Sequence, residues 1–140
     1  MTILDKDVLT QRITAVELHL RRVEERLPRT VEEFRADPDA SDSVTLHLWL
    51  AVQIVIDLGT GLCVHMDLGV PVTYRDAFAR LGAAGVIDSV LAEHLSAAAG
   101  FRNLVAHAYD RVDLSRVFDA ALRGPQDLRA FLRVVRDRAR

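Results

Sequence analysis

Residues 42–66 decide the fold, and they read DSVTLHLWLAVQIVIDLGTGLCVHM. Apolar residues occupy nearly every position of this stretch, and its length and lack of turn residues favour one long helix over a strand. His47, Gln53, Asp57 and two glycines interrupt it, which indicates a buried helix rather than a membrane span. A helix that is apolar on every side must be covered on every side. We therefore expect a second copy of the chain to supply part of that cover, in a homodimer.

The sequence before this stretch predicts an amphipathic helix. Apolar residues recur at spacings of three to five over residues 3–35, between charged ones. Pro28 marks either a kink or a restart within that range. Thr30 and Glu33 follow it in the pattern of a capping box, in which each residue satisfies a free backbone N–H of the new helix.

Turn and capping residues place the ends of the other helices. Residues 37–42, DPDASD, predict a break after which Ser41 or Asp42 caps the long helix. The helices predicted downstream are a short one over 74–81 capped by Thr73, one over about 87–108, one from Asp113 or Ser115 to Leu122, and, after a break at Gly124-Pro125, a last one to the C-terminus. The predicted fold class is therefore all-α, a single domain over 1–140 built as a bundle of four to six helices.

Composition narrows the class of protein further. Of the 140 residues 50% are hydrophobic and 27% charged, a balance typical of a globular domain and not of a disordered chain. The single cysteine, Cys63, excludes an intrachain disulfide and a cysteine-based zinc cluster, and no metal or cofactor is expected. Residues 1–7 lack the apolar segment of a signal peptide, so we expect a cytoplasmic protein with no membrane partner.

Charge is distributed unevenly along the chain. The formal net charge of −2 argues against indiscriminate binding to nucleic acids, which requires a surplus of cations. Residues 101–140 hold nine arginines and five aspartates and so carry +4, which leaves −6 on the first hundred residues. The basic last third either faces a phosphate backbone or is the solvated face of a terminal helix.

Residues 101–110, which read FRNLVAHAYD, gather the side chains best suited to chemistry. Arg102 offers a rigid fork of donors for phosphate oxygens. His107 has the side-chain type whose ordinary pKa lies near neutrality, as proton transfer requires. Asn103 can orient a base or a hydroxyl, and Tyr109 supplies a phenol for stacking or hydrogen bonding.

Helical geometry separates these side chains into two sets. At about 100° per residue, Asn103 and His107 share one face, whereas Arg102 and Tyr109 share another. Arg102 and His107 are about 140° apart on a straight helix, too far to grip one phosphate unless the helix ends early or two copies of the chain meet. A two-fold dimer with this segment at its seam would bring two arginines and two histidines around one cleft. The alternative is that these residues only cap a helix end, where a cation is favoured by the helix dipole.

The run from Arg102 through His107 to Tyr109 resembles the R-x4-H-x-Y motif of HEPN-domain toxins of the HepT-like type. The segment 71–81, PVTYRDAFARL, followed by Gly85-Val-Ile, resembles the one that these proteins carry between their second and later helices. The apolar helix containing Asp57 also fits, so the likeness covers roughly residues 44–131.

The resemblance implies a metal-independent endoribonuclease that works as a homodimer and is the toxin of a type VII-like toxin–antitoxin pair. Arg102 would hold the scissile phosphate, and His107 would transfer a proton as the 2′-hydroxyl attacks, leaving a 2′,3′-cyclic phosphate. Asn103 would position the substrate. Tyr109 would line the cleft and accept AMP from the partner, a minimal (MNT-type) nucleotidyltransferase. The acidic first hundred residues suit a narrow RNA target, such as a tRNA end.

Two other functions remain open on the residues alone. The same pocket in an all-α dimer could hold a nucleotide or a partner without turnover, or the chain could be a purely structural helical dimer. Among the other polar residues, we expect His47 and Asp57 to form a core pair and Cys63 to be a small buried hydrophobe. His94 precedes His107 by thirteen residues, roughly 19 Å along a helix axis, too far to share its site. The remaining histidines, His19 and His65, are expected at the surface.

Overall fold

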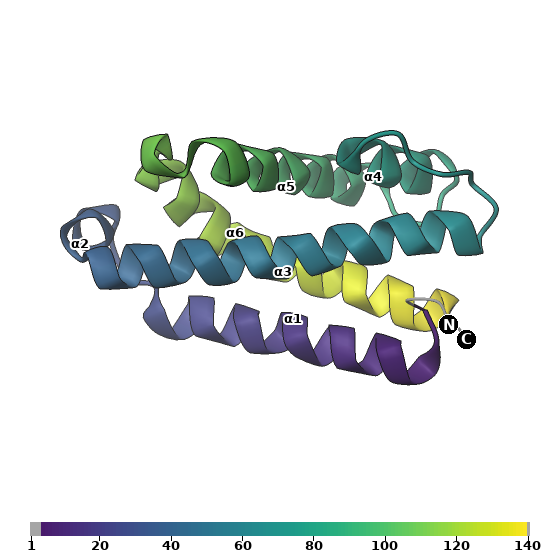
Figure 1. The fold of residues 1–140 in the computed structure, drawn as a ribbon, viewed down its shortest axis with the longest axis horizontal. Helices are drawn as coiled ribbons and strands as arrows, with labels where there is room; N and C mark the ends of the chain where they lie inside the picture. The colour runs from purple at the N-terminus through teal and green to yellow at the C-terminus, as the bar shows by residue number, and fades with distance from the viewer. Residues whose placement is uncertain (1–3, 140) are drawn as a thin grey trace.

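The computed structural model describes residues 4–139, and every regular element in that range is helical. The elements are α1 (Lys6–Arg26), α2 (Val31–Ala36), α3 (Pro38–His65), α4 (Tyr74–Ala83), α5 (Ser89–Ala108), the 3₁₀ turn η1 (Tyr109–Arg111) and α6 (Leu114–Arg138). α3 runs through the middle, with α1 along one side, α4 and α5 along the other, and α6 packed across it (Figure 1). The predicted all-α bundle is confirmed.

Three predicted helix starts are confirmed by their caps. The N–H of Glu33 donates to the Thr30 hydroxyl at 3.2 Å, so the chain restarts a helix after Pro28 and does not merely kink. Thr73 caps α4 in the same way, at 3.1 Å from the N–H of Asp76. At the start of α6, Asp113 accepts from the N–H of Ser115 at 2.9 Å.

The predicted cap of the long helix is wrong. α3 begins at Pro38, and the carboxylate of Asp37 caps it by accepting from the N–H of Ala40 at 3.2 Å. Proline suits this first helical position because its missing N–H would have no partner there. Ser41 is instead buried inside the first turn, where its hydroxyl donates to the carbonyl of Pro38 at 3.3 Å.

The predicted break at Gly124-Pro125 is also wrong, because α6 continues through it to Arg138. An interior proline forfeits the hydrogen bond to the carbonyl four residues earlier, which favours a break when nothing opposes it. Here Pro125 is buried in the core, and a Cβ on Gly124 would lie 3.7 Å from Leu48 of α3. Burial of Pro125 and the packing of α6 against α3 therefore keep the helix continuous.

α3 is enclosed by its own chain. It contacts α1, α2, α4, α5 and α6, and Leu46 and Val64 are its large apolar residues that stay exposed, by 50% and 53%. Within residues 4–139 it is also the one helix long and apolar enough to cross a membrane, but its central place identifies it as a core helix. The apolarity of α3 therefore does not by itself require a second copy of the chain.

Two polar contacts tie α1 to its neighbours. Arg129 of α6 donates to Glu24 through both Nη atoms, at 2.7 and 2.9 Å, and to Glu17 at 3.1 Å. His19 of α1 and His47 of α3 face each other with their Nδ1 atoms 2.9 Å apart. The expected pair of His47 with Asp57 is therefore wrong. His47 contacts His19 of the adjacent helix α1, and Asp57 contacts Gln53.

The histidine pair predicts an acid-sensitive α1–α3 contact. Burial lowers the pKa of both His19 and His47, with a contribution from the nearby Arg22, and His47 further lowers the pKa of His19. A lowered pKa in the folded state means that the neutral pair stabilises the fold above the unfolded-state pKa, and that this contribution is lost as the pH falls. From about pH 7.5 to about pH 5, the free energy of unfolding of the wild type should fall more steeply than that of His47→Gln in urea titrations.

His65→Gln is the matched control, because it removes an exposed histidine from the same helix. It should keep the wild-type dependence on pH. Parallel pH curves for the wild type and His47→Gln would contradict the assignment.

Candidate functional site

Arg102, near the end of α5, is half-buried and reaches toward α3. Its Nε donates to Oε1 of Gln53 at 2.6 Å, and its Nη1 donates to Oδ1 of Asn103 at 3.1 Å. The guanidinium lies over two rings, with its Cζ 5.0 Å from the ring centre of Tyr74 and 5.7 Å from that of Trp49. Such contacts with the negative faces of aromatic rings favour a cation.

A second layer of contacts holds these neighbours in place. Gln53 donates to Oδ1 of Asp57 at 3.4 Å, one turn further along α3. The indole N–H of Trp49 donates to the backbone carbonyl of Arg102 at 3.2 Å, which fixes this turn of α5 to α3. Sequence reasoning missed Gln53, Trp49 and Tyr74 as site residues. The sequence signal that could have indicated Gln53 is its position four residues before Asp57 in an otherwise apolar helix.

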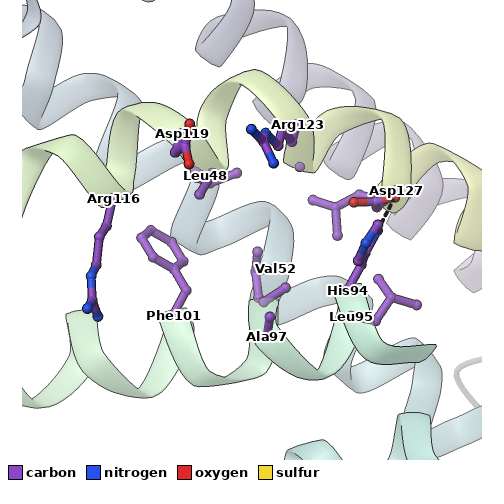
Figure 2. A pocket seen from close by; sticks show the side chains of 14 residues that line it. Leu48, Val52, His94, Leu95, Ala97, Phe101, Arg116, Asp119, Arg123 and Asp127 are labelled. Atoms are coloured by element: carbon purple, nitrogen blue, oxygen red, sulfur yellow. Dashed lines mark hydrogen bonds and ion pairs between the residues drawn. The ribbon is translucent and has the colours of Figure 1, made fainter. Parts of the chain in front are cut away.

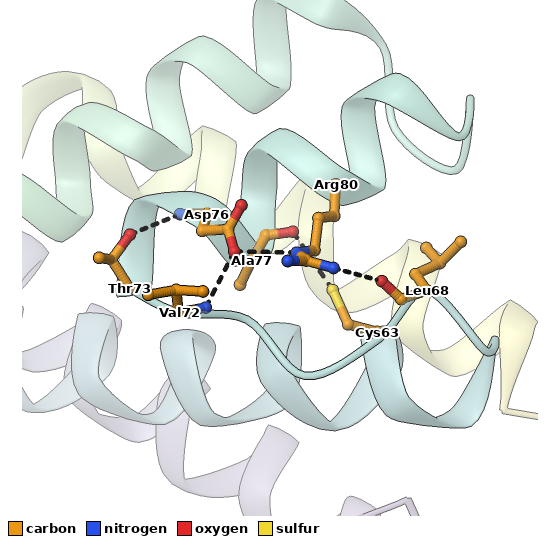
Figure 3. Close-up of polar contacts among 7 residues, drawn as sticks. All are labelled: Cys63, Leu68, Val72, Thr73, Asp76, Ala77 and Arg80. Carbon is orange, nitrogen blue, oxygen red and sulfur yellow. Dashed lines mark hydrogen bonds and ion pairs between the residues drawn. The ribbon is translucent and has the colours of Figure 1, made fainter.

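The first turn of α4 brings Tyr74 to the site, and a polar network fixes that turn (Figure 3). The carboxylate of Asp76 accepts from the N–H of Val72 at 2.9 Å and from Nε of Arg80 at 2.8 Å. Both contacts lower the pKa of Asp76. Arg80 also donates to the carbonyl of Leu68 at 2.8 Å, so the loop before α4 is tied back to the helix.

The hydrogen-bond partners of Arg102 do not neutralise its positive charge, so the guanidinium can bind an anion. Gln53 and Asn103 are neutral, and within residues 4–139 no carboxylate pairs with the guanidinium. A guanidinium has five N–H donors, and the protein uses two of them. The remaining three are free for the oxygens of an anion, and phosphate matches their geometry.

His107 lies apart from Arg102 in one protomer. α5 stays helical to Ala108, so the angle of about 140° expected between the two residues on a straight helix applies. The His107 side chain is exposed, and in the described part of the chain it has no hydrogen-bond partner. Asn103 is on the His107 face and bonds to Arg102, so it links the two sets of residues.

Tyr109 directly follows α5, at the start of η1. Its hydroxyl donates to Oδ1 of Asp42 at 3.1 Å, and the ring is 51% exposed. Burial and the Asp42 carboxylate together raise the pKa of the phenol. Asp42, considered from the sequence as a helix cap, is therefore the anchor of Tyr109.

The other candidate residues do not join this site. Cys63 is buried, its thiol donates to the carbonyl of Ala77 at 3.3 Å, and burial raises its pKa, as expected of a small core residue. His94 pairs with Asp127 at 3.2 Å on the rim of a cavity of about 330 Å³ between α5 and α6 (Figure 2). Nowhere in residues 4–139 do three or more histidine, cysteine or acidic side chains gather as a metal site would require.

This arrangement of helices has known counterparts. The structure of a tri-AMPylated HEPN toxin from Shewanella oneidensis, in complex with an MNT antitoxin, matches with a TM-score of 0.85 and 24% identity over 95% of this chain and 99% of that one. The fold is therefore that of the HEPN toxins. The chain belongs to the ribonuclease HepT-like family, which matches residues 16–135.

Two curated relatives agree with this assignment. The mRNA nuclease HepT of Shewanella oneidensis is 25% identical over 93% of this chain and 97% of its own length. The tRNA nuclease HepT of Aphanizomenon flos-aquae is 32% identical over 52% of this chain and 50% of its own length.

Trp49 provides a built-in probe of Arg102, because it is the one tryptophan in the sequence and its ring lies under the guanidinium. Anion binding at Arg102 should change the charge beside the indole and hence its emission. Titration with a ribonucleoside 3′-phosphate should give a saturable fluorescence change in the wild type and none in Arg102→Ala. Arg116→Ala, a change on α6, should respond like the wild type; an equal response from Arg102→Ala would contradict binding at this guanidinium.

Proposed function

We propose that the chain is a metal-independent endoribonuclease and the toxin of a toxin–antitoxin pair. One observation carries the proposal: Arg102 pairs with no carboxylate and keeps three free N–H donors, in a motif that also holds an exposed histidine. Membership of the ribonuclease HepT-like family supports it, as do the two relatives described as nucleases of mRNA and of tRNA.

The reaction proposed is cleavage by an internal nucleophile. The 2′-hydroxyl of the RNA attacks the adjacent phosphorus, and the bond to the 5′ oxygen of the next nucleotide breaks. The guanidinium of Arg102 holds the phosphate oxygens and stabilises the charge that develops on them. His107 serves in proton transfer, for which an exposed imidazole near neutral pH is suited. The products carry a 2′,3′-cyclic phosphate and a 5′-hydroxyl.

A homodimer completes the proposed site. Because Arg102 and His107 point about 140° apart on α5, one protomer cannot place both on one phosphate. A two-fold axis beside α5 would set Arg102 of one protomer against His107 of the other. Mixing Arg102→Ala with His107→Ala tests this, because only a composite site leaves one intact arginine–histidine pair in the mixed dimer.

The proposed control of the toxin acts through Tyr109, by transfer of AMP from an MNT-type nucleotidyltransferase antitoxin. Tyr109, the last residue of the motif, is exposed, and the similar HEPN toxin of Shewanella oneidensis is described as tri-AMPylated and in complex with an MNT antitoxin. An AMP group next to Arg102 would add a bulky anion where an RNA phosphate must bind. We expect the toxin and its antitoxin to act in the cytoplasm. The RNA target is expected to be narrow, such as a tRNA end.

Purified protein incubated with total RNA and with tRNA in EDTA should cut RNA and leave cyclic-phosphate ends. His107→Ala should lose at least about a hundredfold in rate, the usual contribution of a proton-transfer residue. His65→Gln, the loss of an exposed histidine elsewhere, should cut like the wild type. A folded wild type that binds RNA and cuts neither pool would instead support a non-catalytic nucleotide- or partner-binding module.

Incubation with the nucleotidyltransferase and ATP should add the mass of AMP to the wild type and abolish cleavage. Tyr109→Phe should gain no mass and stay active, because the acceptor hydroxyl is gone. Tyr74→Phe is the matched control, since it removes the other tyrosine of the chain and should still be modified. Modification of Tyr109→Phe, mapped by peptide mass spectrometry, would refute Tyr109 as the acceptor.

A further inference from the structure

A second arginine lies against α5 on the side of His107. The guanidinium of Arg75, in the first turn of α4, packs over Gly100 of α5. A Cβ atom on Gly100 would collide with Nη2 of Arg75 and would lie 3.3 Å from its Cζ and 3.7 Å from its Nε. Glycine is unfavourable inside a helix, and here its missing side chain makes the slot that the guanidinium occupies.

The helical positions put this slot on the catalytic face. Gly100 and His107 are seven residues apart and so fall within about 20° of each other around the axis, with Asn103 between them. Arg102 is about 140° from His107 and faces α3. The cation that shares a face with His107 in one protomer is therefore Arg75 and not Arg102.

Arg75 is free to bind a ligand. Its side chain is exposed, and in the described range 4–139 it forms no hydrogen bond or ion pair. The neighbouring carboxylate, Asp76, is occupied by Arg80 and by the N–H of Val72, so it does not neutralise Arg75. The two neighbours Tyr74 and Arg75 thus contact α5 at different points, Tyr74 at Arg102 and Arg75 at Gly100.

We propose that Arg75 binds a second phosphate of the RNA, next to the scissile one. Gly100 and His107 are about 10 Å apart along the axis, at about 1.5 Å per residue, so Arg75 serves a neighbouring phosphate and not the reacting one. The inference rests on the proposed ribonuclease function and assigns to that site its second backbone contact. Such a contact positions RNA without reading its sequence.

The first test separates binding from chemistry. Arg75→Ala should raise KM for the RNA pool that the wild type cleaves by roughly five- to tenfold, with kcat unchanged, because a lost phosphate contact weakens binding uniformly. The dissociation constant for a fluorescein-labelled, 2′-O-methylated oligoribonucleotide, which cannot be cut, should rise equally. The slope of its logarithm against log salt should fall by about 0.7. Arg12→Ala, the loss of an exposed arginine on α1, should change none of these values.

The second test moves Arg75 without changing it. Gly100→Ala should fold, with stability at least that of the wild type, because alanine favours the helix and the collision is with the end of a flexible side chain. It should nevertheless raise KM as Arg75→Ala does, and the double variant should show no further loss. Gly124→Ala is the matched glycine control, since its Cβ meets Leu48 at an ordinary 3.7 Å.

Each outcome decides the inference. Wild-type KM and salt slope in Arg75→Ala, with RNA cleaved normally, would overturn it and leave the ribonuclease standing. Wild-type KM in Gly100→Ala, with Arg75→Ala impaired, would overturn the placement over Gly100. A folded wild type that neither binds nor cleaves RNA would refute the ribonuclease, and the assignment of Arg75 would fall with it.

Discussion

The structure depends on the need to cover α3 on every side. A helix of 28 residues without a polar face can be stable in water only when neighbours enclose it. In this chain α1, α2, α4, α5 and α6 all contact it, and they are held in fixed positions around it. Two polar side chains in the middle of α3 therefore meet neighbouring helices. Gln53 bonds to Arg102 near the end of α5, and His47 faces His19 of α1.

Residues from α3 and α4 supply most of the contacts that hold Arg102, so the motif itself supplies few of them. A half-buried arginine such as Arg102 would be costly without hydrogen-bond partners, and one paired to a carboxylate would have little attraction left for phosphate. Gln53, Asn103 and two aromatic rings satisfy Arg102 without cancelling its charge. The surroundings of Arg102 are thus set by α3 and α4 as well as by the motif itself.

The sequence predicted the features that depend on local order. Helical periodicity and the caps Thr30, Thr73 and Asp113 need only neighbouring residues, and these were confirmed. Pro125 was misjudged because its cost is local, whereas the packing that offsets it comes from α3. The partners of His47 and Arg102 were missed for the same reason, since His19 and Gln53 are far from them in the chain.

The position of α6 has a consequence for synthesis. Phe131 and Leu128 of α6 complete the core, with Phe131 packed edge-on against Phe78 of α4 at 5.6 Å, and Arg129 fastens α6 to α1. The ribosome makes the motif in α5 before α6, but α3 stays partly uncovered until α6 has emerged. The motif therefore reaches its folded position only after α6 has been made. This delay separates the synthesis of the motif from the assembly of the site around Arg102.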